Sequence, residues 1–317
     1  MPALVEVKNL RKYFDSPNGS LHAVDDVSFK IERGKTMGVV GESGCGKTTL
    51  GRLIVHLEES TGGQILYDGQ DVTHPKRREL NNLREKMRII FQDPYSSLDP
   101  RMTIRRILKE PLVFSQTKYT KSAYERKTEE LMDMVGIAHR LRLSYPHELD
   151  GGRRQRVGVG RALAPNPQFV VCDEPVSALD VSIQAQILNL LRDLQQEFGL
   201  SYLFITHDLS VVKHISDDIC VMYLGQLVET SPSKELFRKP LHPYSKALLS
   251  AIPSLDIHNI RKRIILQGEL TSPVNPKPGC RFAPRCNNTC DKCQEPQILE
   301  EVFENHFVAC CRVRELM

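Results

Sequence analysis

Residues 41–48 read Gly-Glu-Ser-Gly-Cys-Gly-Lys-Thr, which matches the phosphate-binding pattern G-x-x-x-x-G-K-[ST] at every fixed position. This octapeptide constrains the fold because it works only as a tight turn between a buried strand and the first turn of a helix. The apolar run Met37–Val40 directly precedes it, and a helix is expected to begin near Lys47. The pattern therefore predicts an α/β fold that binds a nucleoside triphosphate.

Each position of this phosphate loop answers a physical requirement. Glycines let backbone N–H groups turn inward around a polyphosphate, and Lys47 supplies a point charge for the β- and γ-phosphates. Thr48 offers a hydroxyl to Mg²⁺, while the positive end of the following helix dipole adds to the field. The residues of this segment that are predicted to contact the nucleotide are Gly41, Ser43, Gly44, Cys45, Gly46, Lys47, Thr48 and Thr49.

The bulk composition limits the classes of partner. At 317 residues, the chain is long enough for one large core, or for one core with a smaller appendage. The formal net charge of +4 is too small to indicate a nucleic-acid partner. No apolar run approaches the roughly 18 residues that a membrane-spanning helix needs, and no secretion signal is evident. We therefore expect any work at a membrane to be done from the cytoplasmic side through partner proteins.

Short apolar runs alternate with helical patterns through the first 235 residues or so. Strands separated by helices predict a largely parallel sheet that is covered on both faces. After that point prolines become frequent and most cysteines cluster, so we expect a separate appendage over residues 236–317. The runs expected to form strands are 4–8, 24–31, 36–40, 63–69, 87–91, 169–172, 202–205 and 219–223.

The helical segments carry their own boundary signals. Residues from about 103 to 163 look mainly helical, with breaks expected at Pro111, Gly136 and Pro146, and this predicts an inserted helical subdomain. Asp180 is expected to cap a later helix, and Gly199 to end it. The apolar stripe of that later helix is predicted to consist of Ile183, Ile187, Leu191, Leu194 and Phe198.

Several polar side chains directly follow predicted strands, where α/β folds place ligand contacts. Asp173 can hold Mg²⁺, and Glu174 beside it can orient and deprotonate an attacking water. His207 follows another strand and can contact a γ-phosphate, although a single histidine is more often structural. Gln92 follows the strand at 87–91, and its amide can reach the metal or the water.

An ordered set of short motifs resembles the ATP-binding cassette (ABC) ATPases over about residues 3–235. The motifs are Gln92-Asp93-Pro94, Leu149-Asp150-Gly151-Gly152, Cys172-Asp173-Glu174-Pro175, Ser177-Ala178-Leu179-Asp180 and Thr206-His207-Asp208. The resemblance implies a nucleotide-binding domain over 1–235 of mixed, largely parallel sheet, with an antiparallel N-terminal β subdomain and a helical insertion at about 93–163. It implies that Thr48, Gln92 and Asp173 hold Mg²⁺, and that Glu174, His207 and Gln92 act in hydrolysis.

The same resemblance implies how adenine and the second subunit are placed. Phe14, with Tyr13 as the other candidate, is implied to stack on adenine. ATP is implied to lie between two head-to-tail ATPase subunits, each completing the partner's site with its signature segment, here Asp150, Gly151 and Gly152.

The signature departs from the family's usual Leu-Ser-Gly-Gly-Gln, because the chain has Leu149-Asp150-Gly151-Gly152-Arg153. An ionised Asp150 repels phosphate, at a cost of about 4 kcal/mol for charges 4 Å apart before compensation. Arg153 can offset part of that cost. One interpretation is an asymmetric pair of sites, in which the site built with this signature is weakened. The other is drift, tolerated because the backbone N–H groups of Gly151 and Gly152 still bind phosphate.

The chain has nine cysteines, and six of them fall between residues 280 and 311. Without a secretion signal, this clustering favours a metal over disulfides. Cys280, Cys286, Cys293 and Cys310 follow the spacing C-x5-C-x6-C-x16-C, and four thiolates can hold either a [4Fe–4S] cluster or a zinc ion. Cys290 and Cys311 are extra. A metal-free tail with buried thiols is the third interpretation.

With Leu241-His242-Pro243-Tyr244 upstream, this tail resembles the C-terminal extension of oligopeptide and dipeptide importer ATPases, especially the second of their two ATPase subunits. The resemblance favours the [4Fe–4S] cluster. It implies a peripheral ATPase at the cytoplasmic face of the membrane, with a second ATPase subunit, two permease subunits and an extracytoplasmic binding protein as partners.

The function expected from these patterns is ATP-driven import of di- or oligopeptides. Related importers carry nickel or sugars, and the sequence does not name the cargo. A soluble ABC ATPase acting on nucleic acid or ribosomes is an alternative, but the chain has neither a second cassette nor a long coiled-coil insertion. In a further alternative, the cysteine tail is a redox sensor that gates the ATPase.

Overall fold

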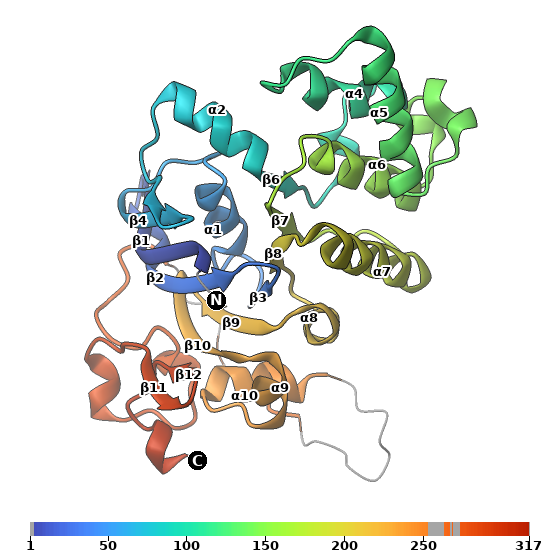
Figure 1. The fold of residues 1–317 in the computed structure, drawn as a ribbon. Helices are drawn as coiled ribbons and strands as arrows, with labels where there is room; N and C mark the ends of the chain where they lie inside the picture. The colour runs from blue at the N-terminus through green and yellow to red at the C-terminus, as the bar shows by residue number, and fades with distance from the viewer. Residues whose placement is uncertain (1–2, 253–262, 267, 269–272, 317) are drawn as a thin grey trace. The chain divides into compact units, whose positions relative to one another are not determined.

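The structure, a computed structural model, describes residues 3–252, 263–266, 268 and 273–316 (Figure 1). The chain divides into two compact units, Met1–His74 with Phe204–Met317, and Pro75–Leu203. The chain leaves the second unit after Leu203 and re-enters the first at Phe204. Both residues belong to the buried strand β8 (Ser201–Ile205). The predicted domain boundary at residue 235 stays a prediction. Among the described helices, none combines the length and apolarity needed to cross a bilayer.

The first unit opens with an antiparallel sheet, as predicted for the N-terminal subdomain. Its strand order is β2-β1-β4-β5, and every pairing in it is antiparallel. Residues on one face alternate with residues on the other, so Tyr13 and Phe14 of β1 point to opposite sides of the sheet. The strands are β1 (Ala3–Ser16), β2 (Gly19–Glu32), β4 (Gly62–Tyr67) and β5 (Gln70–Asp71).

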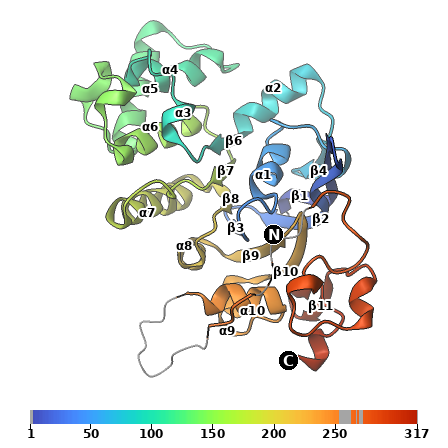
Figure 2. The same ribbon diagram turned by 180° about the vertical axis from the view of Figure 1, so that it is seen from behind.

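A second sheet in the same unit supports the phosphate loop. Strand β3 (Thr36–Val40) is buried throughout and runs parallel to β9 (Asp218–Tyr223). From β9 the sheet continues through antiparallel neighbours in the order β10-β12-β11 (Figure 1). Strands β9 and β10 also lie side by side in the view from behind (Figure 2). The remaining strands are β10 (Gln226–Pro232), β11 (Glu300–Phe303) and β12 (His306–Val308), and the helices are α1 (Lys47–Ile54), α8 (Leu209–Ile215), α9 (Ser233–Arg238) and α10 (Pro243–Ser250).

The second unit contains the predicted helical region and two parallel strands, β6 (Met87–Ile90) and β7 (Phe169–Asp173). Within it, two helices and the C-terminal end of a third contribute Leu112, Leu131 and Ala164 to a small apolar cluster. The elements are α2 (Arg77–Lys86), α3 (Pro94–Ser97), α4 (Ile104–Phe114), α5 (Lys121–Met134), α6 (Gly151–Leu163), α7 (Val181–Phe198) and the 3₁₀ turns η1 (His139–Leu143) and η2 (Pro146–Glu148).

Two details of the helix predictions were wrong. Helix α4 continues through Pro111, because the Pro111 carbonyl still accepts from the Ser115 N–H (3.0 Å) and only the proline's own donor is lost. Phe198 lies 45% exposed at the end of α7, where the apolar stripe has run out of neighbouring core. The predicted cap at Asp180, which accepts from the Ile183 N–H (3.0 Å), and the left-handed Gly199 are confirmed.

The C-terminal extension, expected from its composition as an appendage, adds strands to the second sheet of the first unit. Strand β12 pairs with β10, with Glu229 opposite Val308 and Thr230 opposite Phe307. The carboxylate of Glu229 is fully buried and accepts from the N–H groups of Leu241 (2.8 Å) and His242 (2.9 Å). His306 Nε2 contacts the same carboxylate at 2.7 Å. A carboxylate without solvent access is tolerated here because hydrogen-bond partners from two segments, 241–242 and 306, contact it.

We expect Glu229→Gln to lower the free energy of unfolding by about 3 kcal/mol, since it removes one partner of a buried pair and turns an acceptor oxygen into a donor. Urea denaturation followed by circular dichroism measures this. Glu235→Gln removes an exposed carboxylate that pairs with Arg238 and is the matched control, with an expected change below about 1 kcal/mol. Equal stability of the two variants would contradict the role assigned to Glu229.

Candidate functional site

The phosphate loop links β3 to α1 in the first unit, and two of its glycines are required by close backbone approach. A Cβ added to Gly41 would lie 2.1 Å from the Met222 carbonyl oxygen, and one added to Gly46 would lie 2.0 Å from that of Ala23. Both glycines also have positive φ, at 157° and 105°. The loop is therefore held against β9 and β2 in a shape that side chains at these positions would prevent.

Lys47 lies at the first position of α1 and is 5% exposed. Its ammonium donates to the carbonyl oxygens of Gly41 (2.8 Å) and Glu42 (2.9 Å), so the side chain spans the loop that it closes. Ser43 and Gly44 are exposed at the loop's outer edge, and among the described residues beyond its two neighbours no heavy atom lies within 4 Å of the position that a Gly44 Cβ would take. The exposed loop main chain and the lysine charge thus lie together at the start of α1, where phosphate groups are commonly bound.

Strand β1 distinguishes the two aromatic candidates for adenine. The Tyr13 hydroxyl donates to Asp25, and its ring stacks on His22 with centroids 3.8 Å apart. Burial and the bond to Asp25 raise the pKa of Tyr13 to about 12. Phe14, on the opposite face of the strand, is half-buried and makes an ammonium contact with Lys12, 4.7 Å from the ring centroid. Because the Tyr13 hydroxyl is hydrogen-bonded and its ring is already stacked, Phe14 stays the better candidate for stacking on adenine.

In the second unit, three predicted residues gather at the ends of β6 and β7. Asp173 is the last residue of β7 and is 3% exposed. Glu174 follows with a positive φ of 45°, an unusual conformation for a non-glycine residue and one that is often found at functional sites. Gln92 Nε2 donates to Glu174 Oε2 at 2.9 Å, so the structure brings the predicted amide and the predicted base together.

His207 belongs to the first unit, in the turn between β8 and α8, and its side chain is exposed. The next residue, Asp208, caps α8 by accepting from the Ser210 N–H at 2.7 Å. The phosphate loop and His207 therefore lie in one unit, and Gln92, Asp173 and Glu174 in the other. Their joint action on one nucleotide stays a prediction.

The signature segment begins helix α6, and Asp150 is its N-cap. The Asp150 carboxylate accepts from the Arg153 N–H at 2.7 Å, and Arg153 Nη1 lies 3.3 Å from its other oxygen. A serine can make the same capping bond, so the aspartate keeps the helix start while adding a charge. Gly152 is required by packing, since a Cβ there would lie 2.7 Å from Ile183.

Two residues that touch the phosphate loop were missed in the sequence. The Tyr244 hydroxyl accepts from the Glu42 N–H at 2.9 Å. Arg285 donates to both oxygens of the Glu42 carboxylate, at 2.7 and 3.1 Å. No local pattern could have indicated them, because they lie 202 and 243 residues from Glu42 along the chain.

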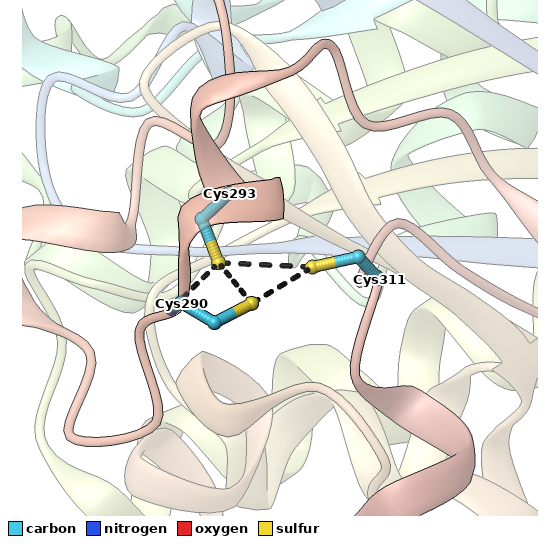
Figure 3. A group of neighbouring side chains, drawn as sticks. All are labelled: Cys290, Cys293 and Cys311. Carbon is cyan, nitrogen blue, oxygen red and sulfur yellow. Dashed lines mark hydrogen bonds between the residues drawn. The ribbon is translucent and has the colours of Figure 1, made fainter.

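The cysteines group differently from the predicted set. The thiols of Cys290, Cys293 and Cys311 lie 3.7–3.8 Å apart (Figure 3), and only Cys293 belongs to the predicted four. The two cysteines set aside as extra are thus in the tightest group. The missed signal was the spacing Cys290-x2-Cys293, which is typical of metal knuckles.

Two of the other predicted ligands, Cys280 and Cys310, lie near Cys293. The Cys280 N–H donates to the Cys293 carbonyl at 2.8 Å. Burial, with the nearby charges of Cys293 and Cys310, raises the pKa of Cys280 to about 11. Burial also raises the pKa of Cys310, and the charges of Cys286 and Cys293 add to this shift. Cys293 therefore belongs both to the close group in the structure and to the predicted set of four, which stays a prediction.

Comparison with known proteins identifies both parts of the chain. The family described as "ABC transporter" matches residues 24–177, and the one described as "Oligopeptide/dipeptide transporter, C-terminal region" matches 228–293. The chain is 50% identical over 312 residues to the putative oligopeptide transport ATP-binding protein YkfD of Bacillus subtilis (strain 168), covering 97% of this chain and 94% of that protein. It is 46% identical over 316 residues to the dipeptide transport ATP-binding protein DppF of Escherichia coli (strain K12), covering 98% and 94%.

Solved structures give the same result for the cassette. The ATP-binding cassette MJ0796, whose structure is described as dimeric and bound to ADP and Pi in a post-hydrolysis state, superposes with a TM-score of 0.67 at 28% identity. The match covers 72% of this chain and 98% of that one. The protein cbiO1 of Clostridium perfringens, described as part of the complex cbiONQ, superposes with a TM-score of 0.67 at 26% identity, covering 75% and 92%.

Replacing Asp150 by Ser and Arg153 by Gln together is expected to raise ATP turnover in the assembled complex by at least threefold or so. Serine keeps the cap of α6 and removes a charge whose repulsion of phosphate is worth about 4 kcal/mol before compensation. Steady-state phosphate release measures this. Turnover equal to that of the parent would refute the weakened-site interpretation and favour tolerated drift.

Proposed function

Because the chain belongs to the ATP-binding subunits of oligopeptide and dipeptide ABC transporters, we propose that it hydrolyses ATP to energise the import of di- or oligopeptides. The observation that carries this proposal is the phosphate loop, with Lys47 spanning it, in a chain that matches these relatives over nearly its whole length. Its cargo class is inferred from relatives named for oligopeptides and dipeptides.

The residues divide the chemistry in the following way. Lys47 turns from the carbonyls of Gly41 and Glu42 to the β- and γ-phosphates, which offer it more negative charge. Glu174, oriented by Gln92, accepts a proton from the attacking water. His207 contacts the γ-phosphate. Catalysis is mostly positioning and electrostatic stabilisation, as expected for phosphoryl transfer.

The oxygen donors of the chain suit a magnesium ion. The hydroxyl of Thr48, the amide oxygen of Gln92 and the carboxylate of Asp173 are hard ligands of the kind that Mg²⁺ prefers. The ion supplies charge neutralisation on the phosphates when bound. Asp173 is buried at the end of β7, directly before the predicted base Glu174.

The proposed partner ATPase subunit is inferred from the signature segment. The signature residues Asp150, Gly151 and Gly152 start a helix in the second unit, and in this proposal they complete the nucleotide site of a second ATPase subunit. The altered signature favours a different chain as that subunit. Two permease subunits and an extracytoplasmic binding protein complete the importer, with this subunit peripheral at the cytoplasmic face of the membrane.

We also propose that the extension holds a metal centre. A [4Fe–4S] cluster on Cys280, Cys286, Cys293 and Cys310 is the first candidate, since four cysteine thiolates are its usual ligands. Zinc is the alternative. Sulfurs bound at about 2.3 Å around a tetrahedral ion stand about 3.8 Å apart, which is the spacing of Cys290, Cys293 and Cys311. The centre is structural in this proposal, because peptide transport requires no electron.

Anaerobic purification followed by iron, sulfide and zinc analysis is expected to find about four irons and four sulfides per chain. Cys280→Ser and Cys286→Ser then abolish iron binding, whereas Cys290→Ser and Cys311→Ser leave it intact. These two pairs are matched controls for each other. If one zinc is found and is lost only in Cys290→Ser and Cys311→Ser, the iron–sulfur cluster is refuted in favour of a single zinc ion. If neither iron nor zinc is found, both forms of the metal centre are refuted.

Lys47→Ala and Glu174→Gln separate nucleotide binding from hydrolysis. We expect Lys47→Ala to weaken ATP binding about a hundredfold, as loss of a charge-assisted contact worth about 3 kcal/mol predicts. Glu174→Gln is expected to bind ATP like the parent and to lower turnover by about 100- to 10,000-fold, since the general base is gone. Nucleotide titration measures the binding step, and peptide uptake in vesicles reports the hydrolysis that drives it. Retained turnover in Glu174→Gln, or unchanged binding in Lys47→Ala, would overturn the assigned roles.

A further inference from the structure

The cysteine-rich extension reaches the phosphate loop itself. Arg285 is the last residue of the 3₁₀ turn η3 (Ala283–Arg285), and its side chain is 9% exposed. Its two terminal nitrogens reach the two carboxylate oxygens of Glu42, the second residue of the loop. This fork-to-fork geometry fixes direction as well as charge, which a lysine could not do.

Tyr244 of α10 holds the same loop residue at its main chain. Its hydroxyl accepts from the Glu42 N–H, and its ring is fully buried against Tyr223 and Phe282, with centroids 4.7 and 5.4 Å away. Buried aromatic neighbours leave this hydroxyl little freedom to move. The peptide of Glu42 is therefore fixed by the extension from two directions.

Glu42 matters to the nucleotide site for two reasons. Its carbonyl oxygen is one of the two acceptors that hold the Lys47 ammonium, so its position sets where the lysine rests. Its carboxylate is a negative charge beside a site that must receive a triphosphate, and an unpaired charge there would repel the ligand. Arg285 neutralises that charge while it holds the residue.

A second contact supports the other side of the loop. Arg281 donates to the Leu224 carbonyl and to Asp25. The adjacent Gly225 N–H donates to the Cys45 carbonyl at 2.8 Å. The extension thus braces the turn between β9 and β10, and this turn holds the loop.

We propose that Arg285 and Tyr244 are positioning residues of the nucleotide site, which hold Glu42 so that the phosphate loop is shaped for the triphosphate before it binds. This inference rests on the proposed ATPase function. Without the two contacts the loop populates other shapes, and the apparent affinity for ATP falls by the fraction of chains that have the binding shape.

The test compares two conservative variants with matched controls in the full-length chain. Tyr244→Phe removes one hydroxyl, and Arg285→Lys keeps the charge and loses the fork. Tyr202→Phe removes a buried hydroxyl that bonds the Leu191 carbonyl, and Arg238→Lys changes an exposed arginine paired with Glu235. Titration with a fluorescent ATP analogue and Mg²⁺ is expected to show about five- to tenfold weaker binding in the first two, and less than twofold change in the controls.

A double-mutant cycle assigns the effect to the pair. We expect Glu42→Gln with Arg285→Gln to bind ATP more tightly than Arg285→Gln alone, since the unpaired carboxylate is then gone. Amide hydrogen exchange in residues 41–48 is expected to accelerate in Tyr244→Phe and Arg285→Lys without a matching fall in the unfolding midpoint. In the assembled complex, KM for ATP rises while kcat at saturating ATP is kept.

Unchanged affinity and loop exchange in both variants would overturn the proposal. So would losses that the Tyr202→Phe control reproduces, because the effect would then reflect general stability. A parent chain that binds no ATP would instead overturn the proposed function, so the two failures are distinguishable.

Discussion

The main-chain cradle between β3 and α1 is the constraint on which the nucleotide site depends. Gly41 and Gly46 pass so close to the carbonyls of Met222 and Ala23 that no side chain fits, and Lys47 ties the loop's own carbonyls together. Strands β9 and β2 carry Met222 and Ala23, so the position of these strands fixes the shape of the cradle. Substitution at either glycine would therefore disturb the strands as well as the loop.

Sequence patterns predicted what local chemistry determines. The strand before the loop, the Asp180 cap and the end of α7 at Gly199 each follow from a few neighbouring residues, and the structure agrees. Pro111 and Phe198 were misjudged because tertiary context decided them: one lost donor is tolerated in α4, and no core lies over the end of α7. The site residues were named from motifs, yet the contacts to Glu42 from Tyr244 and Arg285 span the chain and leave no periodic trace.

The metal ligands of the extension could not be predicted from sequence spacing either. The clustering of six cysteines indicated a metal, but spacing alone could not rank overlapping ligand sets, and the closest thiols are Cys290, Cys293 and Cys311. The attachment of the extension through the buried Glu229 was also invisible in the composition. At the signature, by contrast, the N-cap of α6 explains how an aspartate can replace a serine without loss of the helix.

The distance along the chain between Glu42 and Arg285 has a consequence for biosynthesis. A ribosome makes Glu42 early, and it makes Tyr244 and Arg285, which contact Glu42, 202 and 243 positions later, so the phosphate loop first emerges without these two contacts. Closing so long a segment is slow compared with local folding. Strand β12, which completes one sheet, is made later still. On the proposed roles of Arg285 and Tyr244, the chain therefore gains its full affinity for nucleotide only after these residues of the extension have been made.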